Sequence, residues 1–90
     1  MLKIVVSNRF RKDLENAKKR NLNLKLLEEV VNKLANQEKL DEKYHDHPLL
    51  GKYSDFRECH IKPDWLLIYN IDDEVLEVFL FRTGTHSDLF

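Results

Sequence analysis

The chain contains one cysteine, two prolines and two glycines among its 90 residues. The lone Cys59 excludes an internal disulfide and fits the reducing cytoplasm, where we expect this protein to be located. No run of about 18 apolar residues is present, so the sequence predicts no transmembrane helix and no membrane partner. Residues 1–7 lack the charged region and the apolar block of a signal peptide, and none is expected.

The composition predicts a single domain over residues 1–90, because 42% of the residues are hydrophobic and one small core can form. The net charge of −1 conceals an asymmetry. Residues 1–27 hold eight basic and two acidic residues, a net of +6, whereas residues 28–90 hold seven and fourteen, a net of −7. This split indicates a basic surface for a polyanion or an acidic protein partner, although a solvated helix surface is the simpler alternative.

The first half of the chain predicts one strand and two helices. Residues 1–6 form an aliphatic, β-branched run that is typical of a strand. Apolar residues then recur at helical spacing over residues 8–20 and again over residues 24–37. The short break between the two stripes predicts an antiparallel helical hairpin. Residues 38–54 lack periodicity and are predicted to form an ordered, functional loop.

The second half predicts three strands over residues 56–61, 65–71 and 75–82. Turns at residues 62–64 and 72–73 would join them as hairpins. Together with the N-terminal strand they predict an α+β fold, in which the helical hairpin packs on a four-stranded, largely antiparallel sheet.

Hairpin geometry predicts which side chains meet. If both turns contain two loop residues, Arg82 lies opposite Pro63 and His60 lies opposite Leu67. One end of the sheet then contains the first turn, Arg82 and His60. The chain leaves the last strand at the same end and continues to His86. Arg82 has the parity of the core-facing residues before it, so it must either emerge beyond the core or follow a bulge.

The histidines near this sheet end indicate acid–base chemistry. Histidine is the side chain whose ordinary pKa of about 6.5 lies closest to neutral pH. Several histidines beside an arginine can transfer protons and hold a phosphate without a metal. Structural roles remain open for their neighbours, with Asp64 as a turn residue paired to Arg82, and Trp65 in the core.

Two other chemistries receive less support. Cys59 has no evident histidine partner in the sequence, so thiol catalysis is disfavoured and a core position is expected. His45, His47, His60 and His86 could supply nitrogen ligands to zinc. No cysteine pair and no His-Glu-X-X-His motif accompanies them, so we expect neither a metal nor another cofactor.

Three segments together resemble the YafQ branch of the RelE/ParE toxin superfamily: residues 46–51 (DHPLLG), 56–69 (FRECHIKPDWLLIY) and 82–90 (RTGTHSDLF). The N-terminal half is similar in organisation, a strand followed by a basic helical hairpin. The resemblance implies a RelE-like fold and the toxin of a type II toxin–antitoxin pair that cuts mRNA on the ribosome without a metal. It also implies a set of active-site residues: His47, His60, Asp64, Trp65, Arg82, His86 and Phe90.

The resemblance implies partners as well. A cognate antitoxin would bind the toxin, and the substrate would be mRNA in the ribosomal A site. Ribosomal RNA backbone would meet the basic residues of the first helical region, in salt-dependent contacts that do not read sequence. We expect these contacts at Arg9, Arg11, Lys12, Lys18, Lys19 and Arg20.

The implied reaction assigns a role to each residue. The 2′-hydroxyl attacks the adjacent phosphorus, which leaves a 2′,3′-cyclic phosphate or 3′-phosphate and a 5′-hydroxyl. We expect His86 to act as the general acid and Arg82 to stabilise the charge of the transition state. His47 or His60, oriented by Asp64, would be the base. Two aromatic residues, Trp65 and Phe90, would stack on the substrate bases.

Two non-catalytic functions stay open. The chain could be a binding toxin of the gyrase-poisoning kind, which needs no catalytic histidines. It could also be an inactive module that only binds an antitoxin. The number of acid–base residues favours the nuclease.

Overall fold

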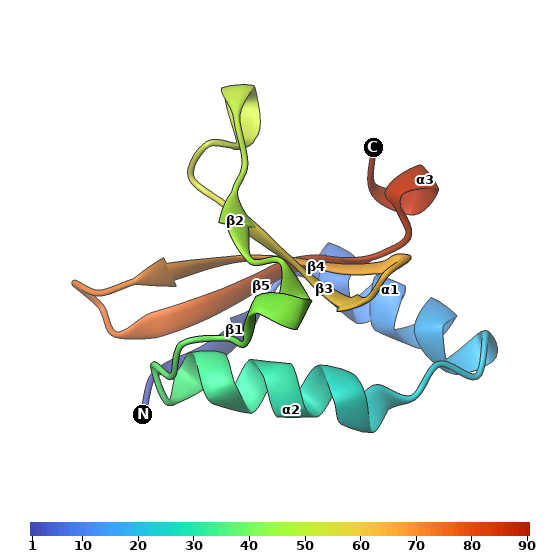
Figure 1. Cartoon of the computed structure of the whole chain (residues 1–90), viewed down its shortest axis with the longest axis horizontal. Helices are drawn as coiled ribbons and strands as arrows, with labels where there is room; N and C mark the ends of the chain where they lie inside the picture. The colour runs from blue at the N-terminus through green and yellow to red at the C-terminus, as the bar shows by residue number, and fades with distance from the viewer.

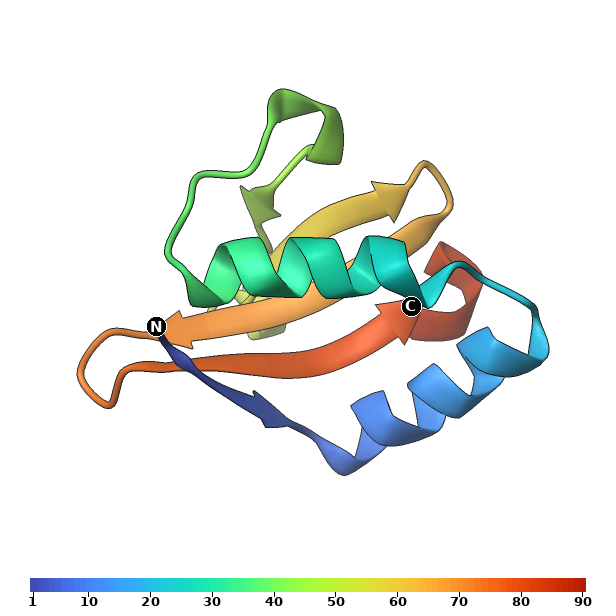
Figure 2. The ribbon, with the colours of Figure 1, turned by 90° about the horizontal axis from the view of Figure 1, so that it is seen from below.

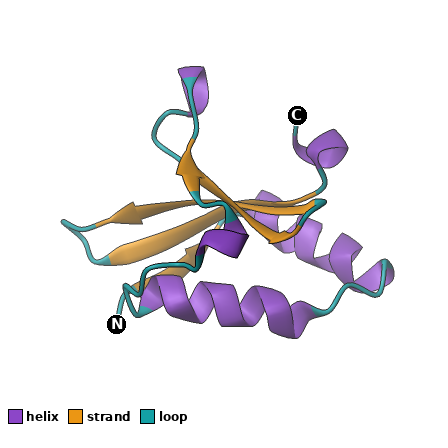
Figure 3. Cartoon of the chain, viewed as in Figure 1, coloured by secondary structure: helices purple, strands orange, loops and turns teal.

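A computed structural model describes all 90 residues as a mixed sheet with two helices on one face (Figures 1 and 3). The helices and strands in chain order are β1 (Lys3–Val6), α1 (Asn8–Lys19), α2 (Leu24–Ala35), β2 (His47–Pro48), β3 (Arg57–Lys62), β4 (Trp65–Asp72), β5 (Glu77–Gly84) and α3 (His86–Leu89). Two short 3-10 helices, η1 (Glu42–Tyr44) and η2 (Gly51–Tyr53), lie on either side of β2. The spatial order of the strands is β1-β5-β4-β3-β2, and the β1–β5 pair is parallel.

The predicted α+β fold is confirmed, but the sheet has five strands rather than four. The additional strand comes from the predicted loop, where His47 and Pro48 pair with Glu58 and Arg57. Two residues are too few to produce a periodic sequence signal. The two long helices also do not form a tight hairpin, because α1 packs on β5 while α2 packs on β3 and β5 (Figure 2).

The helices begin and pack as their sequences require. Ser7 caps α1 by accepting a hydrogen bond from the backbone N–H of Phe10, and Asn23 caps α2 in the same way. Val30 of α2 and Leu67 of β4 are completely buried between the layers. Burial of one such side chain stabilises the fold by about 1.5–3 kcal/mol.

The β4–β5 hairpin differs from the predicted register. Asp72 pairs with Glu77, so the connection has four residues instead of two. The Asp72 side chain accepts hydrogen bonds from the backbone N–H groups of Glu74 and Val75, and Leu76 takes a left-handed conformation with φ of 56°. This longer turn, together with a bulge near the end of β5, places Arg82 opposite Ile68 rather than opposite Pro63.

A bulge then determines which face Arg82 occupies. Leu80 pairs with Tyr69 and Arg82 pairs with Ile68, so Phe81 is the additional residue on β5. A single inserted residue moves everything after it to the other face of the sheet. Arg82 therefore joins a row that crosses the sheet through Ile68 to Glu58 and His47.

The open face of the sheet is enclosed by two projections. In Figure 1 the segment around η2 and the C-terminal α3 rise from the face opposite α1 and α2. The first of these projections belongs to the predicted loop of residues 38–54. None of the helices is long and apolar enough to cross a membrane.

Candidate active site

His60 occupies the centre of a histidine cluster on the open face. Its ring centroid lies 5.7 Å from that of His45, 6.5 Å from that of His47 and 6.4 Å from that of His86. The structure therefore brings together the three histidines that the sequence analysis singled out, and it adds His45.

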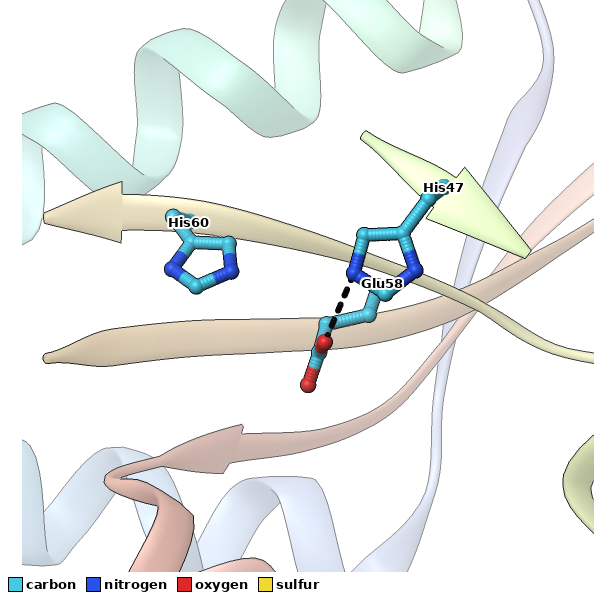
Figure 4. A group of neighbouring side chains, drawn as sticks. All are labelled: His47, Glu58 and His60. Carbon is cyan, nitrogen blue, oxygen red and sulfur yellow. Dashed lines mark ion pairs between the residues drawn. The ribbon is translucent and has the colours of Figure 1, made fainter. Parts of the chain in front are cut away.

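Three different elements supply these side chains. His47 comes from β2 at the edge of the sheet, while His60 lies on β3 beside it (Figure 4). His86 is the first residue of α3, and the Thr85 side chain caps that helix. The β3–β4 turn has the predicted two residues, since Lys62 pairs with Trp65. A bulge between His60 and Lys62 places His60 opposite Leu66, so the predicted pairing with Leu67 is wrong.

Glu58 is a site residue that the sequence analysis missed. Its Oε2 lies 2.9 Å from Nε2 of His47, and its side chain is only 6% exposed (Figure 4). Its other oxygen, Oε1, is buried without a hydrogen-bond partner. A buried carboxylate in this state is costly unless it has a function or a further partner. Strand alternation contained the signal, because Glu58 and His60 are two residues apart and share a face.

Hydrogen bonds distinguish the two neighbouring imidazoles. Nδ1 of His47 lies 3.1 Å from the carbonyl oxygen of Pro48, and its Nε2 faces Glu58. Both ring nitrogens of His47 thus face acceptors, and these two contacts fix the orientation of the ring. Nδ1 of His60 lies 3.3 Å from the carbonyl oxygen of Pro63. That contact favours the tautomer of His60 with a free lone pair on Nε2.

Arg82 pairs with Asp13 and not with Asp64. Its Nε and Nη2 donate to the two carboxylate oxygens of Asp13 at 2.8 and 3.0 Å. This bidentate contact raises the pKa of Arg82 above its ordinary value. Asp64 is exposed, and the ring contacts of His47 and His60 go to other groups, so the structure offers no orienting contact from Asp64.

Trp65 is a core residue, which corrects the expectation that it stacks on a substrate base. It is 3% exposed, and its Nε1 donates to Oγ1 of Thr83 at 2.9 Å. Thr83 in turn donates to the carbonyl oxygen of Leu66 at 2.7 Å. Trp65 thus supports β5 from beneath the site and leaves no face free for RNA.

Aromatic side chains are nevertheless present at the surface of the site. Phe90 is 57% exposed, and its ring centroid lies 6.0 Å from those of His86 and Tyr53. Across the same face, the rings of Phe56 and Phe81 stack at 4.6 Å. The site therefore has the planar groups that unpaired bases require, with Tyr53 in addition to Phe90.

The basic residues of the α1 region divide into two groups. Five of them are exposed and form a basic surface: Arg9, Arg11, Lys12, Lys18 and Lys19. Arg20 differs, because it donates to both oxygens of Asp88 at 2.7 and 3.2 Å. Arg20 is also exposed, so its expected contact with RNA backbone stays a prediction, but the structure already gives it a partner in the C-terminal helix.

The structure also bears on the two disfavoured chemistries. Cys59 is completely buried, and burial raises the pKa of its thiol to about 12, which disfavours the thiolate that nucleophilic catalysis needs. A metal-ligand set does form, although not the four histidines considered from sequence. Ligand atoms of His47, Glu58 and His60 lie within 4.8 Å of one another.

Comparisons with known proteins show the family of the chain. The family model described as "Bacterial toxin of type II toxin-antitoxin system, YafQ" matches residues 2–90. The mRNA interferase toxin YafQ of Escherichia coli K12 is 39% identical over 88 residues, which span 97% of this chain and 94% of that protein.

Solved structures are similar over the whole chain. A metal-bound toxin from Helicobacter pylori is 51% identical and superposes with a TM-score of 0.95, with both chains covered completely. YafQ in the E. coli DinJ–YafQ complex is 36% identical with a TM-score of 0.90, and the match covers 100% of this chain and 99% of that one. This chain therefore belongs to the YafQ family of bacterial type II toxin–antitoxin toxins.

Proposed function

We propose that this protein is an endoribonuclease that cleaves mRNA on the ribosome by metal-independent acid–base catalysis. The observation that carries the proposal is the position of His60 between His47 and His86, beside a buried carboxylate. The E. coli relative is named an mRNA interferase, which agrees with this chemistry.

His60 is proposed as the general base and His86 as the general acid. The contact of His60 Nδ1 with the Pro63 carbonyl leaves Nε2 free to accept the proton of the 2′-hydroxyl. His86 lies 6.4 Å away, ring to ring, so that a phosphate between the two rings can be attacked on one side and protonated on the other. The 5′-oxygen leaves as a hydroxyl, and the other fragment ends in a 2′,3′-cyclic phosphate or a 3′-phosphate.

Two cations are proposed to stabilise the phosphorane. His47, held between Glu58 and the Pro48 carbonyl, carries its charge next to His60. Arg82 uses Nε and Nη2 on Asp13 and retains Nη1 for a phosphoryl oxygen. Charge stabilisation of this kind typically accounts for about 10²–10³ in rate for each donor. Phe90 and Tyr53 are proposed to stack on the bases next to the cleaved bond.

The proposed partners follow from charge and from relatives. The exposed basic surface of α1 would bind ribosomal RNA backbone, which gives a salt-dependent affinity. A cognate antitoxin is expected because the E. coli relative forms a complex with DinJ. An acidic or amphipathic antitoxin segment would complement the same basic surface.

Cleavage of a translated mRNA in a cell-free extract tests the proposal. Wild type should cut within the message, whereas His60→Ala and His86→Ala should each cut about 10²–10⁴-fold more slowly. Lys25→Asp, an exposed charge reversal on α2 outside the proposed catalytic set, is the control. Mapping of the ends should find a 5′-hydroxyl, and cleavage should persist in a chelator at magnesium levels that keep ribosomes intact.

Equal cleavage by wild type and both histidine variants would overturn the acid–base assignment. Growth arrest by His86→Ala at the strength of wild type would instead favour a binding toxin. Harmless expression of the wild-type chain would favour the inactive antitoxin-binding module.

A second proposal concerns the same side chains. His47, Glu58 and His60 offer two imidazole nitrogens and a carboxylate within 4.8 Å, a donor set that suits a divalent transition metal. The unpartnered Oε1 of Glu58 is a further reason, and the similar H. pylori toxin was solved with a metal. A bound ion would engage both histidines and withhold them from proton transfer, so it would inhibit cleavage.

Calorimetric titration with Cu²⁺ tests this second proposal without an activity assay. We expect one site, with much weaker binding in Glu58→Gln and His60→Ala. His45→Ala, which removes an exposed histidine outside the set, is the control. Equal affinity in all four proteins would overturn the assignment.

A further inference from the structure

Helix α1 faces the C-terminal segment with two charged residues of opposite sign. Asp13 lies on α1 and Arg20 is its C-cap residue, seven positions or about two helical turns later, so both lie on the side of the buried Ala17. Asp13 binds Arg82, and Arg20 binds Asp88. Each contact is bidentate, the geometry that best fixes orientation.

The first contact fixes the start of the segment. Besides Arg82, the buried Asp13 carboxylate accepts a hydrogen bond from the backbone N–H of Thr83 at 3.1 Å. One oxygen of Asp13 thus binds both a side chain and the main chain of β5. The side chain of Thr83 is held as well, because its hydroxyl oxygen accepts a hydrogen bond from Nε1 of Trp65.

The second contact fixes the end of the segment. Asp88 accepts from Arg20, and its Oδ2 also accepts from the backbone N–H of Thr85 at 3.0 Å. Gly84 permits this close approach, since a Cβ there would lie 3.0 Å from Cβ and Oδ2 of Asp88, and its φ is +156°. Hydrogen bonds to Arg20 and Thr85 hold the pKa of Asp88 well below its ordinary value, so the pair is charged at neutral pH.

His86 lies between these two anchors. It begins α3, a helix of four residues that is too short to be stable by itself. The ring of His86 lies 6.0 Å from that of Phe90. The positions of both side chains therefore depend on what holds α3 to the rest of the protein. Besides the ring contact of Phe90 with Tyr53, α3 packs on β5 and is tied to the end of α1 by the Arg20–Asp88 ion pair.

We propose that Asp13 and Arg20 are positioning residues through which α1 places the general acid and the charge-stabilising arginine over His60. Asp13 would set Arg82, and Arg20 would set His86 and Phe90 through Asp88. This inference rests on the proposed nuclease activity and assigns to α1 a role beyond its basic surface. Misplacement of reacting groups by about 1 Å can reduce a rate about 10²-fold, so these contacts can matter without touching the substrate.

The competing role for Arg20 is direct binding of RNA. Loss of an RNA contact would raise KM and reduce the salt dependence of binding. Loss of positioning would lower the maximal cleavage rate at saturating substrate and leave the salt dependence of binding unchanged, because no contact with the RNA backbone is lost. The two roles therefore separate in single-turnover kinetics.

Substitutions at Arg20 provide the first test. The maximal rate should fall in the order wild type, Arg20→Lys, Arg20→Ala, Arg20→Asp, because lysine retains the charge but not the bidentate geometry. Arg20→Asp should lose about 10²-fold, and Lys25→Asp is the control of equal charge change. In an Asp88→Asn background, Arg20→Ala should cause no further loss, since its partner is already impaired.

A measurement of dynamics makes the test independent of catalysis. Backbone ¹⁵N relaxation should give order parameters of about 0.85 for residues 84–90 in wild type and values below about 0.6 in Arg20→Asp.

Asp13→Asn should cleave more slowly than wild type at temperatures where both are folded, with Glu15→Gln on the same helix as control. Wild-type rates together with a rigid segment in these variants would overturn the inference. A wild-type protein that does not cleave would contradict the proposed function, and relaxation would still decide whether Arg20 holds α3.

Discussion

Nε2 of His47 lies 2.9 Å from Oε2 of Glu58, although the two residues are eleven positions apart in the chain. The pairing depends on β2, a strand of two residues that sets His47 directly opposite Glu58 on β3. It places the His47 imidazole at the surface and a buried carboxylate beneath it, the arrangement by which an acid orients a histidine.

Replacement of Glu58 by glutamine should uncouple this pair. We expect cleavage to fall about 10²-fold, because His47 loses the carboxylate that stabilises its charge in the transition state. Folding should be retained, since glutamine preserves the shape of the side chain and removes a buried charge. Cleavage rates and a thermal melt of the same preparation check this. A variant with wild-type rates would show that Glu58 has no part in the reaction.

Tyr69→Phe should loosen the segment that presents His47. The Tyr69 hydroxyl donates to Asp46, whose carboxylate also binds Arg57. Loss of a hydrogen bond to a charged group should lower the free energy of unfolding by about 1.5–3 kcal/mol. Denaturant unfolding measures this loss, and Tyr53→Phe, at a less buried hydroxyl, is the control. An unchanged midpoint would mean that Arg57 alone holds Asp46.

Stability should decrease above about pH 8.5, the ordinary pKa of a thiol. Burial raises the pKa of Cys59 to about 12, and it also raises the pKa of Tyr69, chiefly through desolvation and then the bond to Asp46. A group whose pKa is raised on folding contributes stability below its unfolded pKa and loses it as the pH rises toward the folded value. Urea unfolding between pH 7 and 10 checks this. Cys59→Ala should flatten the first part of the decline, and an identical pH profile would contradict the assignment to Cys59.

Trp65→Phe should affect stability more than RNA binding. The substitution keeps an aromatic ring in the core but removes the hydrogen bond to Thr83, at a cost of about 0.5–1.5 kcal/mol. Because Trp65 is the sole tryptophan, its fluorescence reports directly on its surroundings. Short RNA should not quench that fluorescence in the folded protein. Strong quenching, or a large rise in KM for the variant, would restore the stacking role.

Local patterns predicted much of the fold and part of the site. Helical spacing located α1 and α2, and the Pro63-Asp64 turn was predicted with its correct length. The β4–β5 turn was predicted too short, because the left-handed conformation of Leu76 has no signal in its residue type. Asp13 carried a signal that was not used, a charged residue among the apolar positions of α1 next to Phe10.

The sequence by itself determined α1, α2, the four longer strands and the basic residues of α1, since these depend on residues close together in the chain. The family resemblance, and not local pattern, grouped His47, His60 and His86. Only the tertiary structure decided which side chains pair with one another. The bulge at Phe81 moved Arg82 to the open face, and its ion pair with Asp13 spans 69 positions. Such contacts depend on register and on how helices lie over a sheet, and a one-residue shift in register exchanges the two faces of a strand. The sequence therefore supplies the chemical groups of the site, and folding determines their geometry.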